Sequence, residues 1–510
     1  MFGETVLQQW AAGFWAVMTL NAWFFMTVGT FFGIIVGAVP GFTSSMAVVI
    51  LLPVTFYMES LNALVFLCAV YVSAIFGGLL TAILLNTPGT PENSATTFDG
   101  YPMTQQGKAS EALGLGIGAS VTGGLISYVF LLLAMEPVAR IALKFGPTEM
   151  FLIAMMGVTI IAALRGESFG RGILAGAFGL LIGTVGIAPS GEWRATFGQV
   201  YLADGVPLVP AIIGLFAMAE LLFMVEREFV VSGGMPERRS LRRIFAGMGW
   251  VYRYPVNVIR SSIIGIIIGA IPATGATIAA FTSYNEAKRF SRTPEKFGTG
   301  YPPGVVACET ANNASTGGAL MTTLVLGVPG STTCAVIMGA MIMHGLRPGP
   351  QLIREQSVLV YGLTMSLFLS QILMVVMAVG GGYLLSGLLS VPTRILVPVV
   401  SVFCLVGSFA IRNSVFDMFL MLLFGIVGWL MRRTGFPAVA VVLGIVLGPI
   451  ADAELIRSFE RYGSDFYIYF FTRPISLVLL IMIVVGVVGP HLYSRHIQSQ
   501  RMPNVRGEED

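Results

Sequence analysis

The sequence predicts an all-α polytopic membrane protein that contains two inverted-topology repeats. Hydrophobic residues make up 55% of the 510 residues, and charged residues make up only 11%. Soluble proteins carry about 25% charged residues, so a soluble chain of this length would have too few to cover its surface. Glycine and proline are frequent, with 61 and 26 residues, as is typical of membrane helices that are broken at defined positions. Two motifs rich in these residues occur twice, in the same order.

The rest of the composition excludes several classes of protein. A net charge of +3 is too small to indicate an acidic partner, and the apolar composition excludes an extracellular, nucleic-acid-binding or disordered chain. The four cysteines and three histidines are too scattered to predict a disulfide framework, a zinc site or a metal cluster. The first 20 residues contain no lysine or arginine, so they do not resemble a secretory signal.

Apolar segments of spanning length run along most of the chain. A bilayer core requires about 20 apolar residues per helix, so we expect roughly 10–12 transmembrane helices together with broken segments. The segments lie near residues 11–39, 61–86, 111–134, 148–164, 172–188, 206–225, 256–287, 303–328, 357–386, 395–411, 415–431, 436–450 and 474–490. The predicted organisation is a first membrane repeat at 1–225, a basic cytoplasmic loop at 226–260, a second membrane repeat at 261–490 and a polar C-terminal tail at 491–510.

The basic loop at 226–260 fixes the predicted orientation in the membrane. It carries seven arginines, and basic loops face the cytoplasm. Binding to anionic lipid heads or to nucleic acid is the alternative role for this loop. Because residues before position 20 carry no basic charge, the N-terminus is expected on the periplasmic side.

An internal duplication is predicted from two pairs of motifs. Residues 33–47 (GIIVGAVPGFTSSMA) and 265–279 (GIIIGAIPATGATIA) are identical at seven of fifteen positions. A second pair follows in each half: residues 77–90 (GGLLTAILLNTPGT) match 317–331 (GGALMTTLVLGVPGS) with one residue inserted. Two motifs that recur in the same order indicate duplication rather than a shared bias in composition.

The charges beside the first motif of each repeat predict opposite orientations. No basic residue precedes the first copy and Glu59 follows it, whereas the second copy lies between the arginine-rich loop and Lys288. This is the pattern of inverted-topology repeats. Only about 30 residues separate the basic flanks of the second copy, which suits a re-entrant helical hairpin with its tip at Pro272–Thr277.

Four Gly/Pro breaks, two in each repeat, hold the candidate substrate-binding residues. Proline removes a helical N–H and glycine permits positive φ, so each break ends one helix and allows another to begin. Hydroxyl residues after the break suit an N-cap, and a helix N-terminus attracts an anion. Kinks that serve packing alone are the alternative. The candidates are Pro40, Gly41, Thr43, Ser44, Ser45, Asn86, Pro88, Gly89, Thr90, Thr274, Gly275, Thr277, Asn312, Asn313, Pro329, Gly330, Ser331 and Thr332.

A polar stretch in or near an apolar span, Glu309–Asn313, is the second candidate feature. The amides of Asn312 and Asn313 can donate to a carboxylate and accept from sodium, so a sodium site is expected near these residues and Glu309. Glu309 is equally suited to be a buried structural acceptor. The remaining acids of the spans are expected to be interfacial or paired: Glu136, Glu149, Glu220 and Asp417.

Five segments resemble the large membrane subunit of the tripartite tricarboxylate transporter (TTT, TctA-like) family. They are VGAVPGFTSSMAVVILLP, NTPGTPENSATTFDGYPMTQQGKA, IGAIPATGATIAAFTSY, PEKFGTGYPPGVVACETANNASTGGAL and GVPGSTTCAVIMGAMIMHGLRPGP. The resemblance implies a multi-pass carrier of the bacterial inner membrane, a small membrane subunit and a periplasmic solute-binding protein. It also implies citrate-like tri- or dicarboxylate substrates, a sodium ion or proton as the coupling ion, and elevator-like alternating access. One departure is that Tyr71–Ala74 stands where the second repeat has Ala311–Ala314, so the two half-sites differ chemically.

The predicted function is secondary active import of small organic polycarboxylates. An anion channel that uses the same helix ends is the alternative, and electrophysiology separates the two. No nucleophile elbow, phosphate loop or metalloprotease motif is present, so the sequence does not predict an enzyme or a cofactor.

Overall fold

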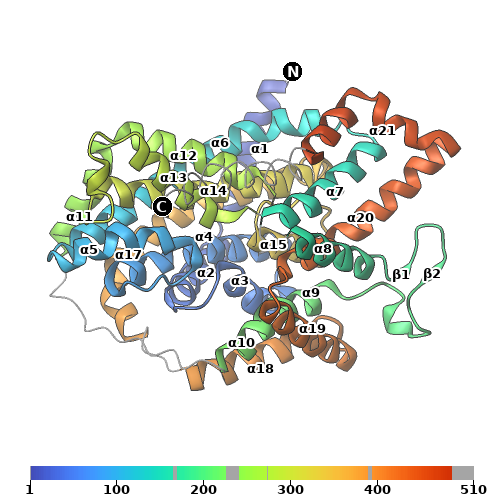
Figure 1. The fold of residues 1–510 in the computed structure, drawn as a ribbon, viewed down its shortest axis with the longest axis horizontal. Helices are drawn as coiled ribbons and strands as arrows, with labels where there is room; N and C mark the ends of the chain where they lie inside the picture. Colours follow the sequence, from blue (N-terminus) through green and yellow to red (C-terminus); the bar gives the residue numbers. More distant parts are fainter. Residues whose placement is uncertain (1, 165–168, 226–239, 273, 389–392, 485–510) are drawn as a thin grey trace, which may run out of the picture. The chain divides into compact units, whose positions relative to one another are not determined.

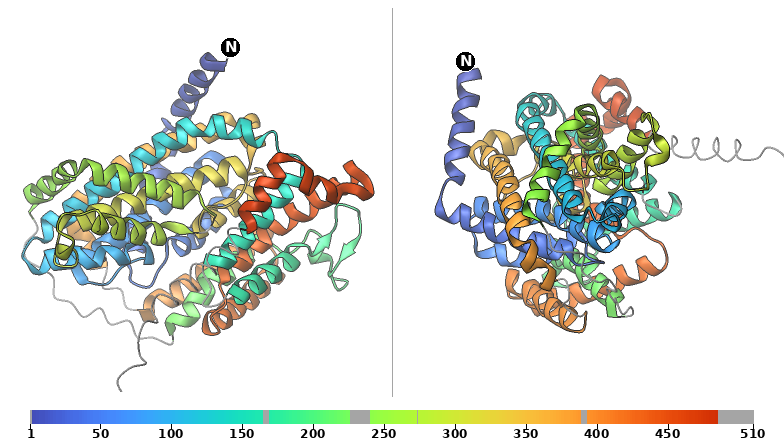
Figure 2. Two further views of the ribbon diagram at one scale, coloured as in Figure 1. Left: turned by 45° about the horizontal axis from the view of Figure 1, so that its top comes forward. Right: turned by 90° about the vertical axis from the view of Figure 1, so that its left-hand side faces the viewer.

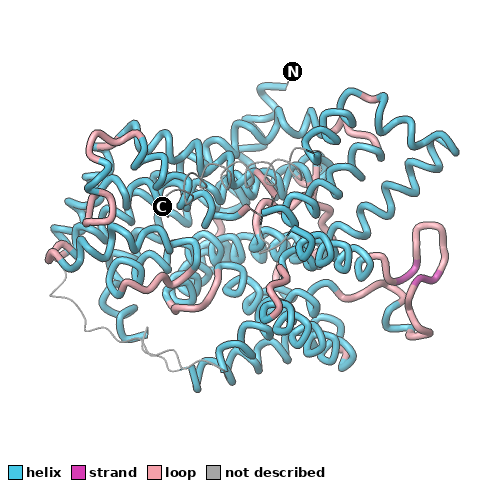
Figure 3. The backbone as a smooth tube through the Cα atoms, in the orientation of Figure 1, coloured by secondary structure: helices cyan, strands magenta, loops and turns pink. Residues whose placement is uncertain are grey.

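The computed structural model describes residues 2–164, 169–225, 240–272, 274–388 and 393–484. These residues are almost entirely helical, apart from a hairpin of β1 (Gly186–Ile187) and β2 (Trp193–Arg194) (Figure 3). Seven of the described helices are long and apolar enough to cross a membrane, and shorter apolar helices accompany them. The predicted all-α, multi-pass membrane fold is confirmed, and the figure of 10–12 spans stays a prediction.

Packing divides the chain into two compact units (Figure 1). Unit 1 contains Met1–Lys144 and Pro207–Leu430, and unit 2 contains Phe145–Val206 and Met431–Asp510. Each unit therefore draws on both ends of the chain. The sequence-based division at 225 and 261 follows the repeats instead, and it stays a prediction. Residues 226–239 of the basic loop and the tail at 491–510 lie outside the described residues.

The first 144 residues of the first repeat supply six α-helices to unit 1. They are α1 (Phe2–Val17), α2 (Leu20–Ala38), α3 (Ser44–Leu51) with a 3-10 extension (Leu52–Tyr57), α4 (Ser60–Leu85), a 3-10 helix (Pro91–Thr96) leading into α5 (Thr97–Gln105), and α6 (Ala109–Ala142). Then α9 (Leu208–Ile212), a π-helical turn (Ile213–Met218) and α10 (Ala219–Val225) lead toward the basic loop.

The second repeat supplies the rest of unit 1. It begins with α11 (Leu241–Trp250), a 3-10 turn (Val251–Arg253), α12 (Pro255–Ala270), α13 (Gly275–Arg289) and a 3-10 turn (Pro294–Lys296). It continues with α14 (Pro302–Met321), a π-helical turn (Thr322–Leu326), α15 (Thr332–Met343), α16 (Pro350–Glu355), α17 (Ser357–Leu388), α18 (Thr393–Arg412) and α19 (Val415–Arg433). Two helices joined by a break thus form at 255–289, as the sequence predicts, and α12 packs on α13. Their re-entrant placement stays a prediction.

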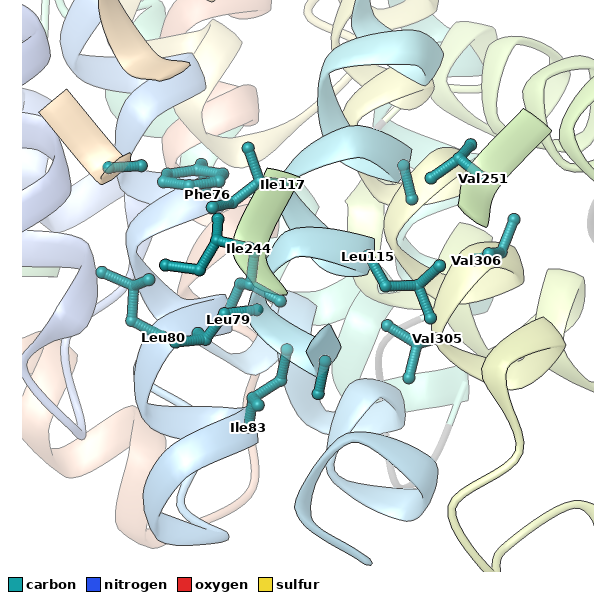
Figure 4. Close-up of a cluster of buried hydrophobic side chains, with 14 of the residues drawn as sticks. Phe76, Leu79, Leu80, Ile83, Leu115, Ile117, Ile244, Val251, Val305 and Val306 are labelled. Atoms are coloured by element: carbon teal, nitrogen blue, oxygen red, sulfur yellow. The ribbon is translucent and has the colours of Figure 1, made fainter. Parts of the chain in front are cut away.

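The core of unit 1 forms where α4, α6, α11 and α14 meet. Leu79 and Ile83 of α4, Leu115 of α6, Ile244 of α11 and Val305 of α14 belong to one buried apolar cluster (Figure 4). Figure 2 shows α6 running alongside α14, which also packs on α12. These contacts hold α14, the helix that carries the predicted polar stretch, between apolar neighbours.

The two repeats build the same backbone contacts, and these contacts fix their register. A Cβ added at Gly77 would lie 2.3 Å from the carbonyl oxygen of Ile34, and one added at Gly318 would lie 2.2 Å from that of Ile266. Gly77 is therefore equivalent to Gly318, and the predicted alignment to Gly317 with an inserted residue is wrong. In this register the two motifs align without a gap. Two alignments are possible on sequence alone, because Gly77 can be matched to either glycine of the Gly317–Gly318 pair.

Helix ends confirm this register. Asn86 after α4 and Gly327 after the π-helical turn both adopt left-handed backbone, with φ of 55° and 70°. Their N–H groups donate to the carbonyl oxygens of Thr81 and Thr322 respectively. The spacing between equivalent residues is the same along both segments, so Tyr71 corresponds to Asn312 rather than to Ala311.

The first helix of each repeat also packs on a helix of the other repeat. In unit 1, α1 packs on α17, and α11 packs on α6. A Cβ added at Gly13 would lie 2.7 Å from the backbone nitrogen of Gly362, and one added at Gly247 would lie 2.3 Å from the carbonyl oxygen of Glu111. Residues 241–250 of the predicted basic loop are therefore a helix with one buried side, so this part is not a fully solvated loop.

The described residues of unit 2 form a group of helices around α20, together with the β1–β2 hairpin. The helices are α7 (Pro147–Leu164), α8 (Phe169–Gly183), a 3-10 turn (Val200–Leu202), α20 (Ala438–Tyr462), a 3-10 helix (Gly463–Ile468) and α21 (Tyr469–Thr472). Both α7 and α8 pack on α20. The hairpin is tied to α20 by Arg194, whose Nη1 donates to both oxygens of Asp452 at 2.8 and 2.9 Å.

Ion pairs form at acids predicted to be interfacial or paired. Glu149 pairs with Arg473 at 3.0 Å, Asp417 with Arg412 at 2.6 Å, and Glu136 with Arg140 at 3.0 Å. Pairing neutralises the charge that each helix carries into an apolar environment. Glu309, described below, has a different environment.

Candidate functional site

All four predicted breaks interrupt helices. The first joins α2 to α3, the second follows α4, the third joins α12 to α13, and the fourth precedes α15. Thr43 caps α3 by accepting from the N–H of Met46, and Ser331 caps α15 by accepting from the N–H of Cys334, both at 3.1 Å. Thr90 and Thr274 precede helical segments without a side-chain cap. Two breaks therefore end in capped N-termini, whose positive dipole ends favour anions.

The glycines of the breaks serve two different purposes. Gly41 and Gly275 have positive φ, 91° and 70°, which a residue with a Cβ adopts only with strain. Gly89 and Gly330 are needed for close packing instead. A Cβ at Gly330 would lie 2.4 Å from the Cα of Ala319 and 2.6 Å from the carbonyl oxygen of Gly269.

Hydroxyl groups from both repeats meet beside the capped helices. Ser44 Oγ and Thr333 Oγ1 are 2.9 Å apart, although 289 residues separate them in the chain. Tyr71 OH on α4 lies 3.2 Å from Ser331 Oγ. Ser44 Oγ also donates to Glu92 Oε1 at 2.7 Å. We call Ser44, Tyr71, Ser331 and Thr333 the hydroxyl cluster; it joins the first and fourth breaks and already binds one carboxylate.

Glu309 on α14 is the centre of a second polar group. Its carboxylate is fully buried. Oε1 accepts from Asn93 Nδ2 at 3.1 Å and from the Thr96 hydroxyl, and Oε2 accepts from Ser120 Oγ at 2.9 Å. These donors come from the 3-10 helix after the second break and from α6, so the Glu309 network ties both segments to α14.

The side-chain amides of the asparagine pair on α14 are buried and lack hydrogen-bond partners among the described residues. Asn312 lies beside the Glu309 carboxylate, and Asn313 is the next residue. Both side chains are completely buried. Neither the amide oxygen nor the amide nitrogen of either residue has a hydrogen-bond partner among the described residues. Buried amides are normally satisfied, so unpaired ones mark a position that an ion or a water molecule can fill.

The family follows from a comparison with known proteins, which matches residues 23–443 to one family model. The chain belongs to the tripartite tricarboxylate transporter TctA family. It is 34% identical over 454 residues to an uncharacterised 52.8 kDa protein of Agrobacterium vitis from the TAR-I ttuC' 3' region, covering 89% of this chain and 90% of that protein. A second Agrobacterium vitis protein, from the TAR-II ttuC' 3' region, is 34% identical over 216 residues, or 42% of this chain and 89% of that protein. No solved structure matches the chain.

The site predictions for this TctA-family protein separate into three groups. Ser44 and Ser331 lie in the hydroxyl cluster, and Asn312 and Asn313 lie beside Glu309. Thr274 donates within its own segment, to the carbonyl oxygen of Ile271 at 2.9 Å. The other predicted residues are confined to the breaks themselves, namely Pro40, Gly41, Thr43, Ser45, Asn86, Pro88, Gly89, Thr90, Gly275, Thr277, Pro329, Gly330 and Thr332. Their contact with a substrate stays a prediction.

Several residues of the two polar groups were not among the predicted site residues. Glu92 and Asn93 lie in the 3-10 helix after the second break, whose polar sequence is the one signal that could have indicated them. Tyr71 lies on α4 and Ser120 on α6. Tyr71 and Ser120 have no such signal, because each is a single polar residue in an apolar or small-residue helix.

An acid outside the candidate spans links the two repeats at a third point. Asp99 Oδ1 accepts from the N–H groups of Gly298 and Gly300, both at 2.9 Å, and of Tyr301 at 2.7 Å. Its Oδ2 accepts from Tyr284 OH at 3.0 Å. Burial raises the pKa of the Asp99 carboxyl, and these hydrogen bonds, which favour the ionised form, offset part of the increase. Asp99 thus fixes the loop between α13 and α14.

Proposed function

We propose that this TctA-family protein is a secondary active importer of small organic polycarboxylates, such as citrate-like tri- or dicarboxylates. It takes its substrate from a periplasmic solute-binding protein, works with a small membrane subunit in the bacterial inner membrane, and is driven by a sodium or proton gradient. Alternating access is elevator-like. Family membership supports the class of transporter, and the contacts at the helix breaks support the kind of substrate.

The observation that carries the proposed substrate class is the bond from Ser44 to Glu92. Here a hydroxyl at the first residue of α3 donates to a carboxylate oxygen at 2.7 Å. Thr333, near the start of α15, lies 2.9 Å from the same hydroxyl. Two helix N-termini and several hydroxyls therefore face a position that accepts a carboxylate, as transporters with broken helices require. Glu92 occupies in this state the position proposed for one carboxylate of the substrate.

Transport measurements test the proposal. The chain and its small membrane subunit are reconstituted in liposomes, and uptake of labelled di- and tricarboxylates is measured with and without the binding protein. We expect accumulation that depends on the cation gradient and on the binding protein. Equal uptake without that protein contradicts its proposed role. A large anion conductance in electrophysiological recordings identifies a channel and contradicts active import.

The proposed inverted orientation of the repeats has its own test. All four cysteines are buried, so a Ser240→Cys variant offers a single accessible thiol. We expect an impermeant thiol reagent to label this variant in inside-out membrane vesicles and not in intact cells, because residue 240 lies in the basic loop predicted to be cytoplasmic. Labelling from outside intact cells contradicts the orientation and with it the inverted repeat.

A further inference from the structure

Glu309 is a buried acid with no basic side chain paired to it in the described part of the chain; Asp99 is another, but it lies outside the candidate spans and four neutral donors bind it. Glu309 is completely buried on α14, yet no ion pair in the described part of the chain includes it. Glu149 and Asp417 are also buried, and each pairs with an arginine. A buried charge is costly unless an opposite charge or a metal ion compensates it.

The hydrogen bonds at Glu309 complement an ionised carboxylate. Both oxygens accept: Oε1 from Asn93 and Thr96, and Oε2 from Ser120. Donors directed at both oxygens favour the charged form of the group. These neutral donors do not supply a counter-charge, so an ionised Glu309 requires a cation beside it.

The unpaired amides lie on the face of α14 that carries Glu309. Residues three and four positions apart share one face of a helix, which places Asn312 and Asn313 one turn along from Glu309. Their amide oxygens are buried and without hydrogen-bond partners in the described part of the chain. Carboxylate and amide oxygens are the ligands that hard cations prefer. A proton on Glu309 would leave the Asn313 amide unpaired, whereas a cation uses the charge and the amide oxygens together.

The equivalent position in the first repeat lacks these groups. In the register fixed by the backbone contacts, Cys68, Tyr71 and Val72 of α4 stand at the positions of Glu309, Asn312 and Asn313. Cys334 stands at the position of Asn93, and it is close to Cys68. The first repeat thus offers thiols and apolar groups where the second offers a carboxylate and amides.

We propose that Glu309, Asn312 and Asn313 form a sodium site in the second repeat, and that this ion is the coupling cation. The coupling role rests on the proposed transport function, whereas sodium binding does not. The hydroxyl cluster, which is separate from these three residues, is then left for the substrate carboxylate. Sodium would neutralise Glu309 and satisfy the amide oxygens at one point of α14.

The experiment measures thermal unfolding of the purified full-length chain without substrate. Sodium chloride replaces choline chloride or potassium chloride at constant ionic strength. We expect a saturable rise of the unfolding temperature with sodium alone, because a ligand that binds only the folded state stabilises it. Glu309→Gln should abolish this rise. Asn312→Ala and Asn313→Ala should each weaken sodium binding by about ten- to a hundredfold, and they keep the test decisive where Glu309→Gln does not fold.

The matched control is Cys68→Ala, the equivalent position of the first repeat, which should keep the sodium response. An identical response to sodium and choline in the wild type, or an unchanged sodium response in all three site variants, overturns the proposal. Carboxylate uptake that a pH gradient drives without sodium, and that Glu309→Gln abolishes, would identify Glu309 as a proton site. That result overturns the sodium site and leaves the proposed import function intact. A sodium response without uptake of any carboxylate retains the site and contradicts the proposed function.

Discussion

The two repeats of unit 1 share their backbone contacts and differ in the side chains at equivalent positions. Close glycine contacts join α2 to α4 and α12 to α14 in the same way, and left-handed residues end both segments. Yet α4 has Cys68 and Tyr71 where α14 has Glu309 and Asn312. The two halves therefore share a scaffold that glycine sterics constrain, as the predicted duplication requires, and they differ in chemistry. Both halves contribute hydroxyls at a capped helix, and the second half also contributes the buried acid Glu309.

The largest expected effect comes from making the two halves alike. Cys68→Glu would place a carboxylate in the first repeat, where Cys334 and Ile337 stand at the positions of the donors Asn93 and Thr96. An unpaired buried charge costs about 3–5 kcal/mol, so we expect a lower unfolding temperature and little folded protein. Cys68→Ser, which adds no charge, is the control. Normal stability of Cys68→Glu would show that the halves are chemically interchangeable.

The next effect tests the contact that the halves share. Gly330→Val should abolish transport, because its Cβ would lie 2.4 Å from the Cα of Ala319. Overpacking against rigid backbone costs about 1–3 kcal/mol or more. Gly89→Val, at the equivalent position, should be as damaging, since its Cβ would lie 2.2 Å from the carbonyl oxygen of Gly37. Maximal uptake at matched expression is the measurement.

Gly425→Val is the control for these changes. A Cβ at Gly425 would lie 2.6 Å from Cγ of Met218, a flexible side chain, so the neighbour can move. We expect more residual uptake for this variant than for Gly330→Val. An equal loss of uptake in both variants would show that the helix breaks serve packing alone.

A smaller effect is expected within the hydroxyl cluster. Ser331→Ala removes a group that caps α15 and lies 3.2 Å from Tyr71 OH. A hydrogen bond to a charged group contributes about 1.5–3 kcal/mol, so substrate affinity should fall by about 10- to 150-fold. Ser366→Ala on α17, which removes a hydroxyl bonded only to its own helix at 2.7 Å, is the control for a lost buried hydroxyl. Unchanged affinity in Ser331→Ala would exclude this cluster from the substrate site.

The smallest effect has the opposite sign. Glu92→Gln keeps the shape of the side chain and removes the negative charge beside Ser44, where a substrate carboxylate is proposed to bind. Relief of like-charge repulsion across about 4 Å is worth at least about 1 kcal/mol, or about fivefold in affinity. Substrate titration should therefore give a lower KM. A higher KM would assign Glu92 to binding rather than to competition.

Local signals in the sequence predicted the breaks, and long-range packing decided the rest. Proline and glycine act within a few residues, so the helix ends near Pro40, Pro88, Pro272 and Pro329 follow from spacing alone. The register of the second motif was one residue in error, because a Gly-Gly pair aligns in two ways. The meeting of Ser44 with Thr333 depends on how α3 packs on α15, which no local pattern encodes.

The packing of α1 on α17, a helix of the other repeat, has a consequence for synthesis. Trp10 and Gly13 of α1 contact Tyr361 of α17, roughly 350 residues later in the chain. At about 5–20 residues per second, α1 leaves the ribosome tens of seconds before α17 exists. The face of α1 that holds Gly13 is therefore exposed to lipid or to the insertion machinery for most of biogenesis. A nascent chain that ends before α17 should be the species on which quality-control proteases act.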